Sequence, residues 1–187
     1  METRSKAEHT LQNTVALLST TPATLNSLLG NLPDALTRSN EGENTWTIFE
    51  VVGHLVYAER SNWIQRAKVV LEHGENGRFE HFDRLGYIRE SEGKSMGGLL
   101  DEFARLRSHN LEQLRAMNLS DADLERQGQH PTFGLVTLSQ LLATWPAHDL
   151  THLHQISRIL AYQYRDTVGP FKVFLGVMKC GGHSSSA

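Results

Sequence analysis

The stretch TLSQLLATWPAHDLTHLHQISRILAYQY, residues 137–164, decides the fold class of this 187-residue chain. Apolar side chains recur along it at intervals of three and four residues, which is the period of an amphipathic helix. Thr137 and Gln140 have the spacing of a capping box, in which each residue bonds the backbone of the other. The sequence therefore predicts a long helix from Leu138 to about Tyr164, with one face buried.

Three further stretches show the same period and complete a predicted bundle of four helices. The first contains Pro22, whose ring should kink or break the helix. The second starts at another capping box, Thr47 and Glu50, and the third starts at Ser95, a residue type favoured at N-caps. The predicted bounds of these three helices are 6–31, 47–73 and 95–118. Gly, Pro and Asn between them mark connections, so we expect an all-α chain.

Long connections separate the predicted helices, and the one after residue 73 spans about twenty residues. After the last helix, the segment TVGPFKVFLGVMK (167–179) is apolar enough to pack back on the bundle as a short C-terminal extension. The small polar residues from about 180 onward should fray. A chain of this length suits one core, so we expect a single domain over residues 1–187.

The composition favours a small-molecule partner. Eighteen basic and twenty-one acidic residues give a net charge of −3, which provides no basic surface for nucleic acid or an anionic membrane. Neither a signal peptide nor an apolar run of about 20 residues is visible, so we expect a cytoplasmic protein. The single cysteine, Cys180, excludes an intramolecular disulfide framework and makes a cysteine nucleophile improbable.

His148 and His152 lie four residues apart in the last predicted helix. With ten histidines in the chain, this spacing alone is weak evidence. However, both point to the side of the helix that also carries Leu141, Trp145 and Ile159, so the pair should face inward. Two imidazoles one turn apart can bind one metal ion, and a stable site needs a third ligand from a facing helix.

His54 is the best candidate for that third ligand, because it flanks an apolar stripe near the start of the second predicted helix. Packed helices approach to about 8–10 Å, a gap that two histidine side chains can bridge. The competing interpretation is that all three are hydrogen-bonded core histidines. His154 should face away from the pair, as a surface or interface residue.

Several other residues are candidates for roles beside a metal. Glu59 interrupts an apolar face, so it is either a general base or hydrogen-bond acceptor near the site, or the partner of an arginine. Gln155 shares the side of the histidine pair and could hold water or substrate, or simply pack. Asp149 points away from direct ligation but could accept a bond from an imidazole. Five aromatic residues could line a substrate pocket or belong to the core: Trp46, Tyr57, Trp63, Phe133 and Trp145.

The chain resembles the DinB-like superfamily of metal-dependent four-helix-bundle proteins over nearly its full length. The resemblance rests on four stretches: TWTIFEVVGHLVYAER (45–60), HPTFGLVTLSQLLATW (130–145), HDLTHLHQISR (148–158) and QYRDTVGPF (163–171). In that family, a histidine early in the second helix and an HxxxH pair in the last helix form a metal triad. The resemblance thus assigns the metal to His54, His148 and His152.

The resemblance also implies a bundle with long crossover connections, a homodimer, and a divalent metal, with zinc or nickel the foremost candidates. Family members with known activity resemble S-transferases or isomerases that use a low-molecular-weight thiol. The leading hypothesis is therefore a metal-dependent thiol transferase with an open three-histidine site, where the ion's charge would favour the thiolate. One alternative is a hydrolase that uses water, with Glu59 as its base. Another is a non-catalytic scaffold stapled by the metal.

Overall fold

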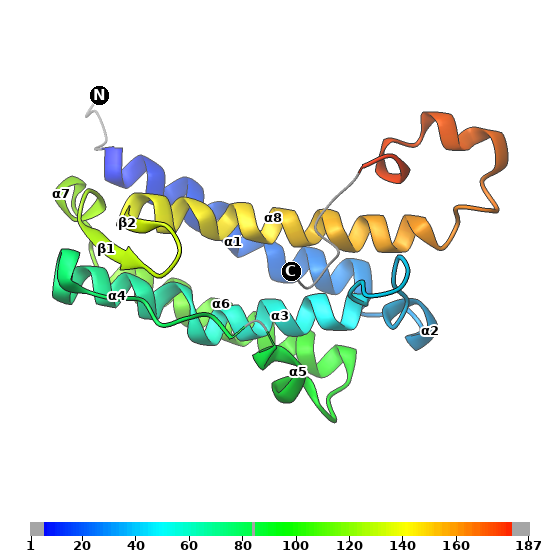
Figure 1. Cartoon of the computed structure of the whole chain (residues 1–187), viewed down its shortest axis with the longest axis horizontal. Helices are drawn as coiled ribbons and strands as arrows, with labels where there is room; N and C mark the ends of the chain where they lie inside the picture. The colour runs from blue at the N-terminus through cyan, green and yellow to red at the C-terminus, as the bar shows by residue number, and fades with distance from the viewer. Residues whose placement is uncertain (1–5, 84, 181–187) are drawn as a thin grey trace.

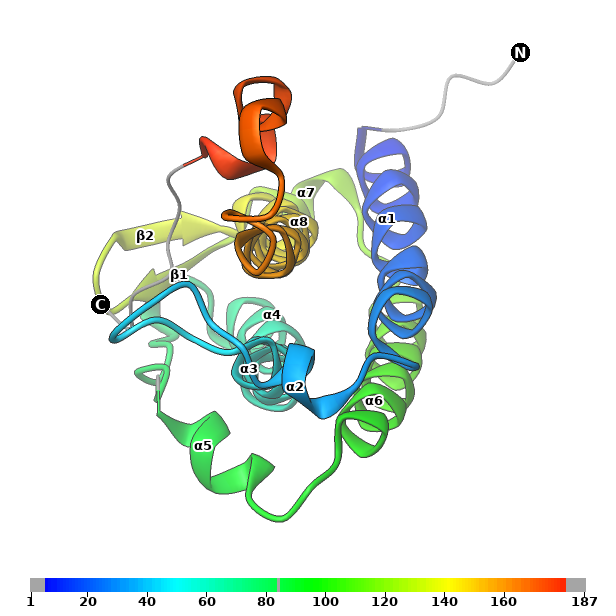
Figure 2. The same cartoon turned by 90° about the vertical axis from the view of Figure 1, so that its right-hand side faces the viewer.

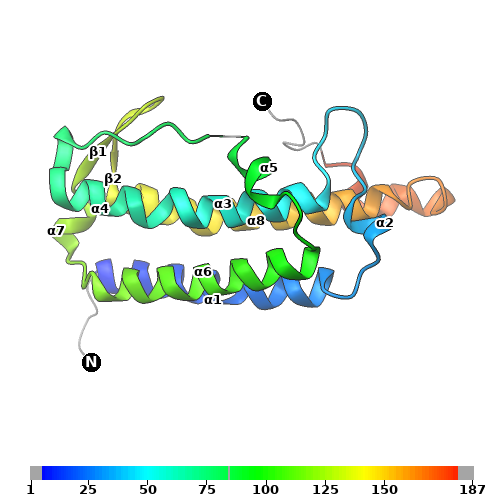
Figure 3. The same cartoon turned by 90° about the horizontal axis from the view of Figure 1, so that it is seen from below.

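Four long helical segments dominate the computed structural model, which describes residues 6–83 and 85–180 (Figure 1). They are α1 (Lys6–Leu29), α3 (Ile48–Ser61) continued by α4 (Trp63–His73), α6 (Met96–Ala116) and α8 (Leu138–Tyr162). Figure 3 shows α1 and α6 in one layer and α3, α4 and α8 in the other. The predicted four-helix bundle is thus confirmed.

The order of the helices around the bundle differs from their order in the chain. The main packing contacts join α1 to α6, α6 to α3, α3 to α8, and α8 back to α1. α1 and α3 are therefore diagonal neighbours, as are α6 and α8, an arrangement that Figure 2 shows nearly end-on. The chain therefore passes from α1 to α3 and from α6 to α8 by long crossovers, residues 30–47 and 117–137, as the resemblance implied.

The predicted helix starts are confirmed at the level of single hydrogen bonds. The capping boxes at Thr47 and Thr137 are both formed, each with its side chain accepting from the backbone N–H three residues on. The Ser95 side chain accepts from the backbone N–H of Gly98. These bonds satisfy N–H groups that a helix otherwise leaves unpaired.

Two predictions about helix continuity need correction. α1 continues through Pro22 without a break and ends at Leu29 rather than residue 31. The helix predicted over 47–73 is divided at Asn62 into α3 and α4. At Asn62 the backbone dihedral angle ψ is −67°. The Ser61 hydroxyl donates to the carbonyl oxygen of Tyr57, a contact that tends to bend helices. α6 and α8 each end two residues before the predicted position.

The prediction of an all-α chain missed a small hairpin. β1 (Gln127–His130) pairs antiparallel with β2 (Gly134–Thr137), and Arg78 forms an isolated bridge with Gln129. Short helical turns fill the connections: α2 (Asp34–Thr37), η1 (Gly74–Asn76), α5 (Gly86–Ser91), α7 (Asp121–Leu124), η2 (Gly169–Phe174) and η3 (Gly176–Met178). The hairpin lies beside the start of α8 and α4 (Figure 1).

The C-terminal extension folds back only in part. η3 contacts α8, but Phe171, Val173 and Phe174 stay 68%, 61% and 83% exposed. The residues from 181 onward, which were expected to fray, lie outside the described residues. Across the described ranges, none of the helices has the length and apolar content that a membrane span requires.

Candidate metal centre

His54, His148 and His152 meet between α3 and α8. The Nε2 atom of His148 lies 3.1 Å from Nε2 of His54 and 3.2 Å from Nε2 of His152. One ring nitrogen from each of the three lies within 4.8 Å of the others, and no other described group of histidine, cysteine or carboxylate side chains meets this condition. His148 and His152 lie one turn apart on α8, and His148 reaches His54 of α3 across the space between the two helices.

This arrangement fits a divalent ion. Tetrahedral coordination with metal–nitrogen distances of 2.0–2.1 Å places two ligand nitrogens about 3.3 Å apart, close to the two distances observed. Hydrogen bonds explain the cluster less well. A neutral imidazole carries one proton, so the three converging Nε2 atoms cannot all be satisfied by one another. A cation between them satisfies all three lone pairs.

Burial keeps the three imidazoles in the neutral form that a metal needs. Burial first, and then the nearby His152, lower the pKa of His54 from 6.5 to about 3. Burial also lowers the pKa of His148 well below 6.5, with further contributions from His152, His54 and Arg107. For His152, burial lowers the pKa while its bond to Gln155 and the charge of Asp149 oppose the shift. Near neutral pH their lone pairs are free to bind metal.

Gln155 positions one of the three imidazoles. Its Oε1 atom lies 2.8 Å from Nδ1 of His152, and Gln155 is only 3% exposed. When Nδ1–H donates to this amide oxygen, the Nε2 lone pair of His152 faces the cluster. Within the described residues, Nδ1 of His54 and Nδ1 of His148 have no such partner. The sequence predicted that Gln155 lies on the same side of the helix as the histidine pair, and in the structure it contacts His152, a candidate metal ligand.

Glu59 is paired with an arginine, which was one of the two interpretations of its sequence position. It is 1% exposed, and its carboxylate accepts bonds from Arg107 at 2.9 Å, Trp145 at 2.8 Å and Asn110 at 3.0 Å. Glu59 is absent from the lining of the pocket beside the histidines. Its role as a general base therefore has no geometric support.

Arg107 also binds Asp149, so one buried guanidinium faces two carboxylates. Asp149 accepts from Arg107 at 2.6 Å and 2.9 Å and from the Thr21 hydroxyl at 2.6 Å. Burial alone would lower the pKa of Arg107, but Glu59 and Asp149 together raise it. The group acts on the triad with both signs: Arg107 helps to lower the pKa of His148, whereas the charge of Asp149 opposes the lowering of the pKa of His152.

Sequence reasoning did not single out Arg107, although a signal was present. Arg107 lies four residues after Phe103 and four before Leu111, so it interrupts the apolar stripe of α6. A charged residue on such a stripe is buried, and a buried charge needs a partner.

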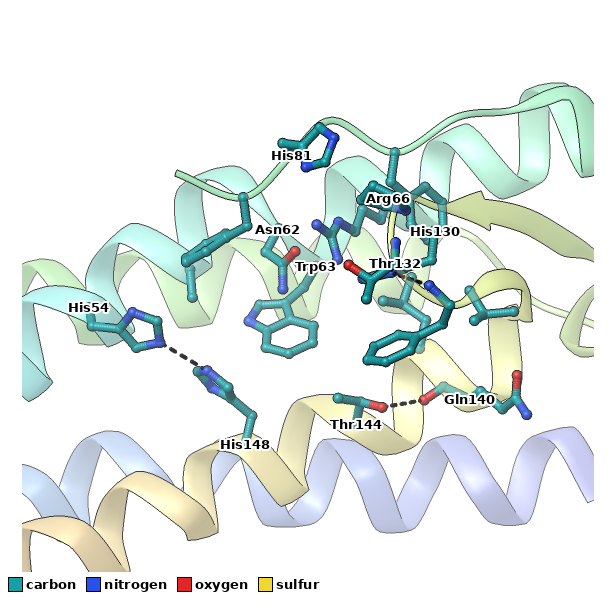
Figure 4. A pocket seen from close by; sticks show the side chains of 17 residues that line it. His54, Asn62, Trp63, Arg66, His81, His130, Thr132, Gln140, Thr144 and His148 are labelled. Atoms are coloured by element: carbon teal, nitrogen blue, oxygen red, sulfur yellow. Dashed lines mark hydrogen bonds between the residues drawn. The ribbon is translucent and has the colours of Figure 1, made fainter. Parts of the chain in front are cut away.

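A pocket of about 450 Å³ adjoins the triad, with His54 and His148 in its wall. It runs from the two histidines along α4 and the start of α8 to the hairpin, as Figure 4 shows. Two of the five aromatic candidates, Trp63 and Phe133, line it. Trp145 is fully buried in the core and Trp46 stacks on His152, with ring centroids 6.1 Å apart. His154 is exposed, as expected.

Fold and site together define a class: a four-helix bundle with a candidate three-histidine metal centre opening on a pocket. The chain belongs to the DinB superfamily, whose family model matches residues 17–156. Among solved structures it is similar to YfiT from Bacillus subtilis, described as a probable metal-dependent hydrolase with an unusual four-helix bundle topology. That similarity has a TM-score of 0.66 and 24% sequence identity over 88% of this chain and 91% of that chain. No curated protein matches the chain.

Proposed function

We propose that His54, His148 and His152 bind one divalent ion, zinc or nickel, and that the protein is a metal-dependent S-transferase or isomerase using a low-molecular-weight thiol. The observation that carries this proposal is the position of the triad at the end of the pocket. Catalytic metal sites commonly use three protein ligands and leave a further position for water or substrate. The cluster has three members among the described residues, rather than the four of a closed structural site.

In the proposed function, different residues of the site have different roles. The three imidazoles would hold the ion, Gln155 orients His152, and Trp63, Phe82 and Leu141 give the pocket an apolar wall for the substrate. A bound divalent ion supplies positive charge, which favours the deprotonated form of a thiol or water molecule. A thiol from outside is consistent with the position of the chain's own Cys180, which is exposed on the C-terminal extension and absent from the pocket lining.

A second candidate function is a metal-dependent hydrolase, in which water replaces the thiol. The description of YfiT favours it, since that structure shares the fold. The buried pairing of Glu59 with Arg107 counts against the version in which Glu59 is the base.

One experiment separates these candidates. Metal-loaded protein is incubated with an electrophile panel and glutathione, bacillithiol or mycothiol, and also with the same panel without thiol. Turnover that requires a thiol, and that is lost in His148→Ala, supports the transferase. Turnover without thiol supports the hydrolase. Metal binding without turnover in either assay would favour the scaffold.

We also propose that the chain forms a homodimer, as the resemblance implies. The exposed side chains of Phe171, Val173 and Phe174 offer an apolar surface for it. Sedimentation velocity tests this, and replacement of all three by Ser should shift a dimer to a monomer.

A further inference from the structure

The pocket has a long axis with the histidines at one end. On α3 and α4, residues 54, 58, 62 and 66 recur every four positions and all line it. On α8, residues 140, 144 and 148 do the same from the opposite side. At a rise of about 1.5 Å per residue, the backbone of Arg66 lies about 18 Å along the helix from that of His54. The distance between the ends of the two side chains can be shorter. Figure 4 shows this succession from His54 through Asn62 to Arg66.

Arg66, at the far end of the pocket from His54, has no acidic partner within the described residues. It is half-buried, and the one described hydrogen bond of its guanidinium is to the carbonyl oxygen of Glu80 at 3.2 Å. Its guanidinium also lies 5.2 Å from the ring centroid of Phe79. Burial lowers its pKa, with no carboxylate to offset the effect, although an arginine remains charged at neutral pH. A partly desolvated guanidinium with spare donors is a ready anion site.

His130 lies beside this end of the pocket and adds a donor without adding charge. Its Nδ1 atom accepts from the backbone N–H groups of Thr132 and Phe133 at 3.1 Å and 3.3 Å, so in the neutral ring Nε2 carries the proton. Burial, and then the nearby Arg66 and His81, lower the pKa of His130. Arg66 is therefore the fixed positive charge here, which matches a monoanion such as a carboxylate better than a doubly charged phosphate.

Asn62 provides an independent sign of a ligand. It is 9% exposed and lines the pocket between the two ends, yet its buried Oδ1 atom has no hydrogen-bond partner among the described residues. Its side chain also makes no capping bond to α4. A buried amide without a partner costs free energy, and a polar group on a bound molecule would remove that cost.

We propose that this pocket binds a small carboxylic acid, with its reactive end at His54 and His148 and its carboxylate on Arg66. The apolar wall between them would hold the carbon skeleton, and Asn62 would bond a polar group on it. The orientation of the substrate rests on the proposed metal-dependent function, whereas the carboxylate site depends only on Arg66 and its surroundings.

Two titrations test the proposal. In the first, cobalt-loaded protein is titrated with ω-mercaptoalkanoic acids of two to ten methylene groups and with the matching amides, using the absorption of the cobalt–thiolate bond. We expect the acids to bind at least about tenfold more tightly than the amides at an intermediate chain length, as bonds to a charged group imply. In the second, calorimetry compares the affinities of the protein for octanoate and octanamide. This comparison requires neither a thiol nor a bound metal.

Arg66→Gln should remove the preference for acids in both titrations and leave the amides unchanged. Arg78→Gln, at an exposed arginine outside this pocket, is the matched control and should keep the preference. Unchanged cobalt content and amide affinity would show that Arg66→Gln is folded. Equal binding of acid and amide by the wild-type protein overturns the carboxylate site. Failure to take up cobalt overturns the proposed function instead, while the octanoate comparison still decides the carboxylate site.

Discussion

At the scale of single residues, His148 is the centre of the candidate site, because its Nε2 atom is within 3.2 Å of both other histidines. His148→Ala should reduce bound metal from about one ion per chain to nearly none, since two ligands from different helices hold a first-row metal poorly. Elemental analysis of purified protein measures this. His154→Ala, which removes an exposed histidine of the same helix, is the control and should retain the metal.

Gln155 acts on the metal only through His152. Gln155→Leu keeps most of the side-chain volume but removes the acceptor of the Nδ1–H bond, so the affinity for zinc should fall roughly 10- to 100-fold. Competition with a chromophoric chelator measures the affinity. Gln155→Glu should retain most of it, because a carboxylate also accepts this bond. An unchanged affinity in Gln155→Leu would mean that packing alone orients His152.

The buried histidines also predict how the stability of metal-free protein depends on pH. In the unfolded chain His54 titrates near 6.5, whereas burial lowers its pKa in the fold to about 3. The unfolded state therefore binds more protons between these values. Stability should fall as pH drops from about 6.5 toward 3, by up to about 1.4 kcal/mol per pH unit for such a histidine. Urea denaturation at several pH values measures the slope, which His54→Phe should reduce. A slope equal to that of the wild type in this variant would contradict the assignment.

Helical periodicity was enough to predict that His148 and His152 face inward, whereas the choice of His54 as their partner depended chiefly on the resemblance. Arg66, Asn62 and Arg107 could not be assigned in the same way. Their roles depend on which other segments lie beside them. These are the 77–83 segment and the hairpin for Arg66, and the adjacent helix α3 and the diagonal helix α8 for Arg107. Periodicity along one helix contains no information about which residues of another helix face it.

At the scale of elements, the start of α8 joins the hairpin to the helix that carries two of the three histidines. Thr137→Ala removes the side-chain acceptor of the capping box and should lower the free energy of unfolding by about 1 kcal/mol. Ser157→Ala removes a hydroxyl that only bonds back to the Leu153 carbonyl of the same helix, and should change stability little. Chemical denaturation of both variants tests this. Equal losses would show that the cap contributes nothing specific.

The helix starts were predictable because capping boxes are local, with partners three residues apart. The hairpin was not, because each strand has only four residues, and five of the eight are Gly, Gln or His. It forms through pairing with a distant segment and through Gly128, where an added Cβ would lie only 2.9 Å from side-chain atoms of Phe79 and Val70. The division at Asn62 was equally hidden, since the apolar period continues across it.

At the scale of the whole molecule, the Arg107 group joins all four long helices. It connects Thr21 of α1, Glu59 of α3 and Asp149 of α8 to Arg107 and Asn110 of α6. Arg107→Met would leave two buried carboxylates without their cation, so we expect a loss of about 3–5 kcal/mol. Arg105→Met, at an exposed arginine of the same helix, should have little effect. Denaturation curves for the two variants decide this, and a loss below about 1 kcal/mol for Arg107→Met would contradict a stabilising role.

We propose that His54, His148 and His152 hold one metal ion at the end of the pocket. Anomalous diffraction from crystals of zinc- or nickel-loaded protein tests it most directly. We predict a single strong peak within 2.0–2.1 Å of one ring nitrogen from each of the three histidines. A peak bound elsewhere in metal-loaded crystals, or three histidines bonded only to one another, would contradict the claim.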